Sequence, residues 1–180
     1  NETEIKLNRN PKVNNFKNLL RTKGNLNFNQ IKKIAKLLNF NLNNLKEIDG
    51  YIDLSTKIDF SLTKQFKIKN LKYFSEGVVN NAKIKTTSKN NIKKYLPDYN
   101  QIFFLKETKI KLSNLKGYQS AEFAGLIKVK DSFDNFEVKE FYHFKDKSYN
   151  FKGNFNLTNT KINISSLNYQ KGRKKKSELS

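Results

Sequence analysis

The chain has 180 residues and no cysteine, which excludes a disulfide framework and a thiolate metal site. Lys and Arg number 36 against 16 Asp and Glu, so the formal net charge is +20. No run of about 18 apolar residues is present, and the sequence therefore predicts no membrane-spanning helix.

The positive charge favours an anionic partner, either nucleic acid or an anionic membrane surface. Arginine, which nucleic-acid readers favour for bidentate contacts, occurs only at Arg9, Arg21 and Arg173. The abundance of Asn, Ile, Phe and Tyr is typical of an AT-rich genome. We therefore interpret the charge mainly as codon bias on a solvated face. An anionic membrane surface stays open as a partner, and nucleic acid is the less favoured one.

Shifts in composition divide the chain into four parts. The polar, proline-containing start is predicted to be irregular, although Val13, Phe16, Leu19 and Leu20 could form a short strand or a helical turn. The end of the chain is rich in lysine. The predicted parts are residues 1–24, an irregular N-terminal segment; residues 25–50, a short helix and its connection; residues 51–170, a repeated antiparallel β-groove; and residues 171–180, a basic mobile tail.

One segment carries a helix signal. Ile31, Ala35 and Leu38 recur at helical spacing and predict a short amphipathic helix of about 10 residues. Asn29 precedes this run and is suited to cap the helix N-terminus. Asp49-Gly50 is typical of a turn that leads into the first strand.

Alternating apolar and polar residues dominate the chain from residue 51 onward. Ile52 and Leu54 fall on one face of the first predicted strand, and Asp53 and Ser55 fall on the other. Turn-forming residues separate the strand-like segments. These segments are 51–62, 65–74, 78–87, 101–114, 120–130, 135–144, 148–158 and 160–168. The sequence thus predicts a mainly β fold, a long curved antiparallel sheet of consecutive hairpins with one short helix near the N-terminus.

A sheet with one apolar face must cover that face. Two sheets could stack as a sandwich, one sheet could close as a barrel, or a curved sheet could leave its apolar face open as a groove. Gly125 and Gly153 lie inside predicted strands and favour bends in a curving sheet. The alternation leaves all three arrangements open.

The sequence offers no set of residues suited to catalysis. His143 is the only histidine, and one imidazole cannot complete a metal site. Asp131 and Asp134 lie in a predicted turn, where aspartate is favoured for its geometry. The seven glycines are isolated and form no phosphate-binding loop. We therefore expect no enzymatic activity, no cofactor and no metal.

The chain resembles the AsmA-like proteins of the bacterial envelope, including the C-terminal regions of long, repetitive members. The stretches that carry the resemblance are Gly24-Asn-Leu-Asn-Phe with the following helix, Gly50-Tyr-Ile-Asp-Leu-Ser-Thr-Lys-Ile-Asp-Phe, Phe66-Lys-Ile-Lys-Asn-Leu-Lys-Tyr, Glu76-Gly77 and Asn154-Phe-Asn-Leu. The resemblance covers most of residues 22–170. It implies a trough with an apolar inside along which phospholipid acyl chains slide between two membranes.

The resemblance implies a non-enzymatic piece of a lipid-conducting protein, on the periplasmic side of the inner membrane in the bacterial cell envelope. Its expected partners are phospholipid and the rest of a longer parent chain, since the sequence begins at Asn1 rather than methionine. The alternatives are a basic β-domain that binds nucleic acid and a purely structural β-sandwich.

In the lipid-binding hypothesis, apolar residues of one parity line the trough. They are Ile52, Leu54, Ile58, Phe60, Leu62, Phe66, Ile68, Ile110, Leu112, Phe123, Ile127, Val129, Phe136, Val138, Phe151, Phe155, Leu157, Ile162 and Ile164. Four basic residues near the C-terminus could contact lipid headgroups, although a solvated terminus is the alternative. They are Arg173, Lys174, Lys175 and Lys176.

Overall fold

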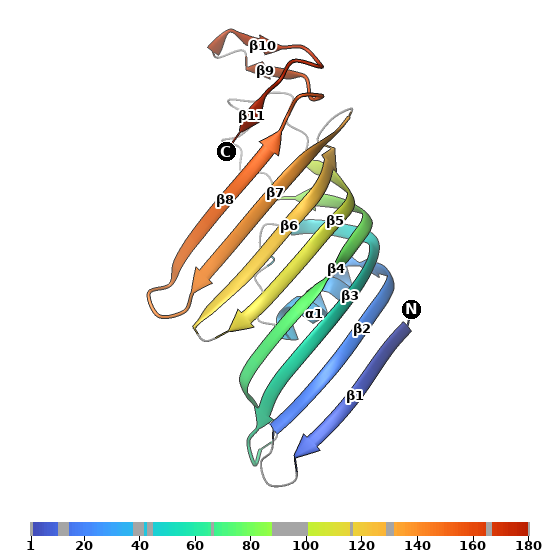
Figure 1. Cartoon of the computed structure of the whole chain (residues 1–180), viewed down its shortest axis with the longest axis vertical. Coiled ribbons are helices and arrows are strands. Elements are labelled where there is room, and N and C mark those ends of the chain that lie inside the picture. The colour runs from blue at the N-terminus through green and yellow to red at the C-terminus, as the bar shows by residue number, and fades with distance from the viewer. Residues whose placement is uncertain are drawn as a thin grey trace.

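The computed structural model describes residues 2–10, 15–37, 42, 45–65, 67–87, 101–115, 117–128, 132–164 and 167–179. Nine strands of this part form one antiparallel sheet in the order β1-β2-β3-β4-β5-β6-β7-β8-β11, and β9 and β10 form a second, two-stranded sheet (Figure 1). The strands are β1 (Glu2–Asn10), β2 (Asn15–Asn27), β3 (Leu45–Leu62), β4 (Ile68–Thr86), β5 (Ile102–Leu115), β6 (Tyr118–Lys128), β7 (Phe133–His143), β8 (Ser148–Asn156), β9 (Ile162–Ile164), β10 (Tyr169–Lys171) and β11 (Glu178–Leu179).

The predicted fold class is confirmed. The large sheet is a run of consecutive hairpins that does not close, because β1 lies at one edge and β8 with the short β11 lies at the other (Figure 1). One short helix, α1 (Phe28–Leu37), follows β2. Among the described residues the large sheet is therefore an open layer rather than a sandwich or a barrel.

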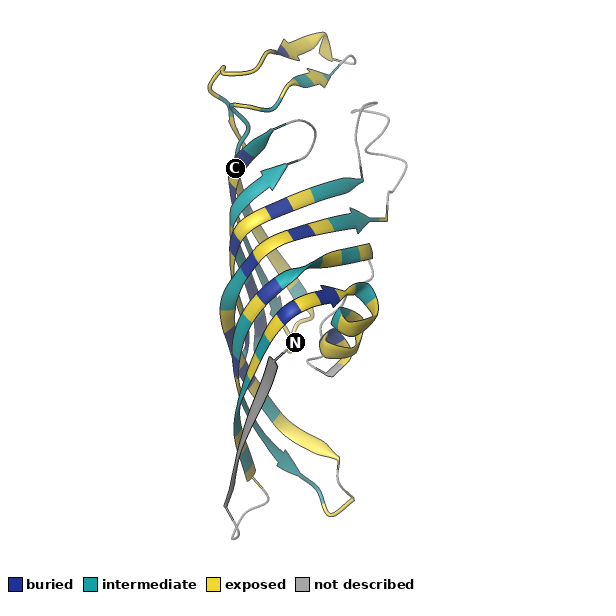
Figure 2. Cartoon of the chain, turned by 90° about the vertical axis from the view of Figure 1, so that its right-hand side faces the viewer, coloured by how far each residue is buried: buried dark blue, intermediate teal, exposed yellow. Residues whose placement is uncertain are grey.

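The register places apolar side chains of successive strands on one face. Ile52 of β3 pairs with Gly24 of β2 and with Val79 of β4, and Phe136 of β7 pairs with Phe155 of β8. Directly paired residues lie on the same face of a sheet. One face is therefore apolar across seven strands, and we call it the concave face because the sheet curves toward it (Figure 2).

Irregular pairing accompanies this curvature. The β3–β4 register shifts between Tyr51 and Ile52, and the β5–β6 register shifts between Lys106 and Lys109. Glu107, inside the second shift, has a positive φ of 49°. A bulge adds one residue to a strand, bends it and increases its twist. We attribute the curvature of the sheet in part to these two positions.

The bulges also reset the alternation of side chains. Val79 and Ala82 are three positions apart in β4, yet both belong to the core cluster. Leu105 and Thr108 in β5 show the same spacing, and both are buried. The apolar face therefore continues past each bulge, although a strict period of two would place these residues on opposite faces.

Helix α1 packs on the concave face over β2 and β3 (Figure 2). Ala35 is buried, and Ile31 packs against the core cluster. The cap is Asn27 rather than the predicted Asn29. The backbone N–H of Gln30 donates to Asn27 Oδ1 at 3.1 Å, and the backbone N–H of Asn27 donates to Gln30 Oε1 at 3.0 Å. The two residues thus form a reciprocal capping box.

Two predicted boundaries near the N-terminus are wrong. The described residues of the predicted segment 1–24, namely 2–10 and 15–24, are not irregular, because they form β1 and most of β2. Residues 45–50, predicted as connection, are the start of β3. The alternation in β2 was missed because Asn18 and Thr22, polar residues, lie on the same face as Phe16 and Leu20.

The segments predicted as two strands, 65–74 and 78–87, form the single strand β4. Glu76-Gly77 lies between these two segments and was predicted as a turn, but both residues are inside β4. A Cβ added to Gly77 would overlap the backbone carbonyl of Asp53 and lie 2.8 Å from Leu54 Cα, so the glycine permits close approach of β3. The sequence before Pro97 also predicts a helical turn at residues 91–96, and this segment lies outside the described residues.

Residues 171–179, predicted as a basic tail, contain strand residues. Lys171 belongs to β10, and β11 pairs with β8. The Lys171 side chain is buried, and its ammonium donates to the carbonyls of Thr158, Gly172 and Lys175 at 3.2–3.3 Å. Backbone carbonyls thus hold this buried cation, and the C-terminal segment is tied to the large sheet.

Candidate ligand groove

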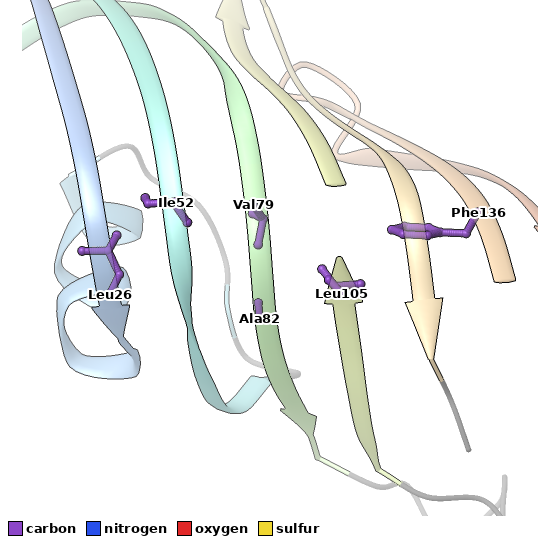
Figure 3. Close-up of a cluster of buried hydrophobic side chains, with 6 residues drawn as sticks. All are labelled: Leu26, Ile52, Val79, Ala82, Leu105 and Phe136. Carbon is purple, nitrogen blue, oxygen red and sulfur yellow. The ribbon is translucent and has the colours of Figure 1, made fainter. Parts of the chain in front are cut away.

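The concave face carries the apolar core of the protein. Its six buried members come from β2, β3, β4, β5 and β7 (Figure 3). They are Leu26, Ile52, Val79, Ala82, Leu105 and Phe136. Further apolar side chains pack against them while keeping part of their surface exposed. These are Ile31 of the helix and Leu54, Ile84, Ile110, Phe123, Ile127, Val138 and Phe155 of the sheet.

Most of the lining residues predicted from sequence lie on this face. Eight of them belong to the core cluster or pack against it, and the register places six more on the same face. The eight are Ile52, Leu54, Ile110, Phe123, Ile127, Phe136, Val138 and Phe155. The six are Ile58, Phe60, Leu62, Ile68, Leu112 and Phe151.

The remaining predicted residues lie elsewhere. Ile162 and Ile164 belong to β9 in the two-stranded sheet and therefore do not line the concave face of the large sheet. Leu157 follows the end of β8, where its amide donates to the Ser177 carbonyl at 2.8 Å. Phe66 and Val129 lie outside the described residues.

Sequence reasoning missed several core residues. Val79, Ala82 and Leu105 flank the bulges, so they do not fit one uninterrupted period of two. Leu26 was assigned to the helix connection although it is two residues from Gly24 on the same face of β2. The alternation of Phe16, Leu20 and Leu26 was a signal that could have revealed it.

The β8 end of the concave face exposes large aromatic side chains. Tyr149 is 59% exposed and Phe151 is 56% exposed. Helix α1 packs on β2 and β3, near the opposite edge of the sheet. Exposed apolar surface at the margin of a larger apolar face is typical of a ligand or partner site.

A row of polar side chains runs along one side of the apolar band. The register aligns Tyr73, Asn114, Gln119, Tyr142 and Tyr149 across β4 to β8. Burial raises the pKa of Tyr73 well above its ordinary value, although a hydrogen bond with Gln119 acts in the opposite direction. The hydroxyl is therefore neutral over the physiological range.

The register defines which described positions of β2 to β8 lie on the concave face together with the core cluster. None of these positions carries a basic side chain. The two acidic residues among them are Asp134 and Glu140. Asp134 is 3% exposed and accepts hydrogen bonds from the Asn159 amide at 2.9 Å and from Thr160 Oγ1 at 2.6 Å. Asp134 thereby anchors the turn after β8.

The opposite face is polar and charged. Lys23 lies 3.5 Å from Asp53, and Lys139 lies 3.1 Å from Glu137. The hydrogen bond and charge of Glu137 raise the pKa of Lys139. Exposed pairs of this kind contribute little stability, so this face is principally a solvated surface.

A hollow of about 820 Å³ lies at the strand ends, lined mostly by side chains of the polar face. Its basic residues are Lys83, Lys106 and Lys128. The Lys128 ammonium lies 4.6 Å from the ring centroid of Phe104 and 5.4 Å from that of Phe133, within range of a cation–π interaction.

The four residues predicted to contact headgroups, Arg173 to Lys176, lie between β10 and β11 and are exposed. Lys176 Nζ lies 3.6 Å from a carboxylate oxygen of Glu178. The concave face and these basic residues therefore belong to different parts of the fold.

His143 ends β7 on the polar face, with its ring centroid 6.2 Å from that of Tyr118. Within the described ranges, no three His, Cys, Asp or Glu side chains gather in a way that could hold a metal ion. No described helix is both long enough and apolar enough to cross a membrane. Comparison with protein-family models, curated proteins and solved structures returned no match.

Proposed function

We propose that the chain is a non-enzymatic piece of a lipid-conducting protein of the bacterial envelope, and that its concave face holds phospholipid acyl chains. The single observation that supports the proposal most is an open sheet whose one apolar face continues from β2 to β8 and ends in exposed aromatic residues. We place its site of action on the periplasmic side of the inner membrane by resemblance.

The dimensions of the groove suit an acyl chain. Neighbouring strands lie about 4.8 Å apart, so the six steps from β2 to β8 span roughly 29 Å. One leaflet contributes about half of the ~30 Å hydrocarbon core of a bilayer. The apolar band is therefore longer than one acyl chain, and each methylene that it removes from water contributes about 0.8 kcal/mol.

Native mass spectrometry with lipid extraction, on chain purified from a bacterial host, tests the proposal. We expect phospholipid to co-purify at a reproducible stoichiometry. A chain that carries no lipid and takes up no fluorescent fatty-acid probe would contradict the proposal.

Two matched variants distinguish a lipid-binding groove from an apolar face that binds no ligand. Phe151→Asp places a charge on an exposed concave-face position, and Phe74→Asp makes the same change on the polar face at a 37% exposed position. Both variants should fold, as circular dichroism would show. Phe151→Asp should lose most of the bound lipid, whereas Phe74→Asp should keep it. Equal lipid content in the two variants would count against the groove.

A further inference from the structure

The distribution of charge on the concave face restricts what it can bind. A chain of net charge +20 has no Lys or Arg on the described concave positions of β2 to β8. Asp134 is buried and accepts two hydrogen bonds. Glu140 is only partly buried, and it is therefore the charge on this face that a ligand can reach.

Three aromatic residues are neighbours of Glu140 on the concave face. Glu140 pairs directly with Phe151, and the adjacent residues on the same face, Tyr142 and Tyr149, pair with each other. Burial raises the pKa of Tyr149, and the hydrogen bonding and charge of Glu140 raise it further. Tyr149 and Phe151 are both more than half exposed, so the surface of this cluster is open to solvent. We call these four residues the Glu140 cluster.

A carboxylate beside several aromatic rings has the chemistry of an ammonium site. Ring faces attract cations, and aromatic cages are the usual recognition device for quaternary ammonium groups. A carboxylate adds direct charge attraction. An anionic headgroup would instead meet Glu140 with no cation on the described concave positions of β2 to β8.

We propose that the Glu140 cluster binds the ammonium ion of a zwitterionic phospholipid headgroup while the acyl chains lie on the adjoining apolar band. This inference rests on the proposed lipid groove and names the lipid class that it takes. The cluster adjoins that band directly, because Val138 and Phe136 are the next residues on the same face of β7, on the N-terminal side of Glu140.

Competition between two lipids with identical acyl chains tests the preference. The full chain is incubated with vesicles that contain equal parts of dioleoyl phosphatidylcholine and dioleoyl phosphatidylglycerol, and the bound lipids are counted by mass spectrometry. We expect phosphatidylcholine to be enriched about tenfold. Glu140→Gln should bring the ratio close to one while total bound lipid stays unchanged.

The control is Glu137→Gln, the same substitution on the same strand but on the polar face, where the residue pairs with Lys139. It should keep the wild-type ratio. Equal binding of both lipids by the wild type, or an unchanged ratio in Glu140→Gln, overturns the ammonium site and leaves the groove standing. Absence of both lipids from the wild type overturns the groove itself.

Titration with tetramethylammonium, which has no acyl chain, tests the cluster without the groove. We expect NMR chemical-shift changes at Tyr149 and Phe151 in the wild type and in Glu137→Gln, and their loss in Glu140→Gln. No change in the wild type would overturn the ammonium site whatever the lipid experiment gives.

Discussion

Close approach of two backbones makes Gly77 a residue on which the sheet depends. The β4 backbone at this position lies against Asp53 and Leu54 of β3, where a side chain has no room. The strands on both sides are fixed by their own pairing, so neither can move away without breaking ladder hydrogen bonds. The glycine is therefore required by packing rather than by an unusual φ.

We predict that Gly77→Ala lowers the free energy of unfolding by about 2 kcal/mol or more, because overlap in a packed region forces the backbone to shift. Gly172→Ala is the control, since a Cβ there meets nothing within 4 Å. Urea unfolding followed by circular dichroism measures both. Equal stability of the two variants would show that β3 and β4 can separate at Gly77 without cost.

Helix α1 begins directly after β2, and its first turn depends on the cap at the junction. The strand ends at Asn27, and the reciprocal hydrogen bonds of Asn27 and Gln30 satisfy backbone groups that the first helical turn leaves without partners. The helix then buries Ala35 on the concave face. A loss at the cap therefore weakens the cover over β2 and β3.

We predict that Asn27→Ala destabilises the protein by about 1 kcal/mol, the usual cost of removing a helix cap. Asn29→Ala is a matched control inside the first turn and should change stability by less than about 0.5 kcal/mol. Thermal unfolding measures both changes. A larger loss from Asn29→Ala than from Asn27→Ala would contradict the capping assignment.

The sequence predicted the elements of the C-terminal half of the large sheet well, because strands β5 to β8 alternate with few interruptions and turn residues separate them. The prediction of strands from sequence was wrong where a local residue pattern suggested a different structure. Gly77 resembles a turn residue but serves interstrand packing, and Asn18 and Thr22 interrupt the apolar period of β2. Such positions are determined by the neighbouring strand, which a local pattern does not contain.

The candidate groove was predictable in part. Parity alone identified Ile52, Phe136 and Phe151 as residues of one face. The Glu140 cluster could not be found in this way, because it requires the register between β7 and β8. A shift of one residue in that register would place Phe151 opposite a residue of the other face.

The molecule as a whole separates its two kinds of surface. On the described positions of β2 to β8, the concave face carries the apolar band and two acidic residues, whereas the basic residues of these strands lie on the polar face or at the strand ends. Attraction to an anionic partner and binding of an acyl chain are thus expected at different places. They should also respond differently to salt, since exposed charges are screened and apolar burial is not.

We predict that binding to phosphatidylglycerol vesicles or to RNA falls at least about tenfold between 0.05 and 0.5 M salt, as counterion release and screening require. Uptake of a fluorescent fatty acid should change little over the same range. Phe151→Asp should leave the vesicle and RNA binding intact, as sedimentation and fluorescence anisotropy would measure. If fatty-acid uptake fell with salt in parallel with vesicle or RNA binding, one surface would serve both kinds of ligand.

The order of the strands in the sheet has a consequence for biosynthesis. Each strand from β2 to β7 pairs with the strand that precedes it in the chain and with the one that follows. These pairings join strands that are neighbours in the sequence, which favours rapid folding for a β protein. The sheet can grow by one strand at a time as the polypeptide leaves the ribosome, and each new strand finds its template already in place.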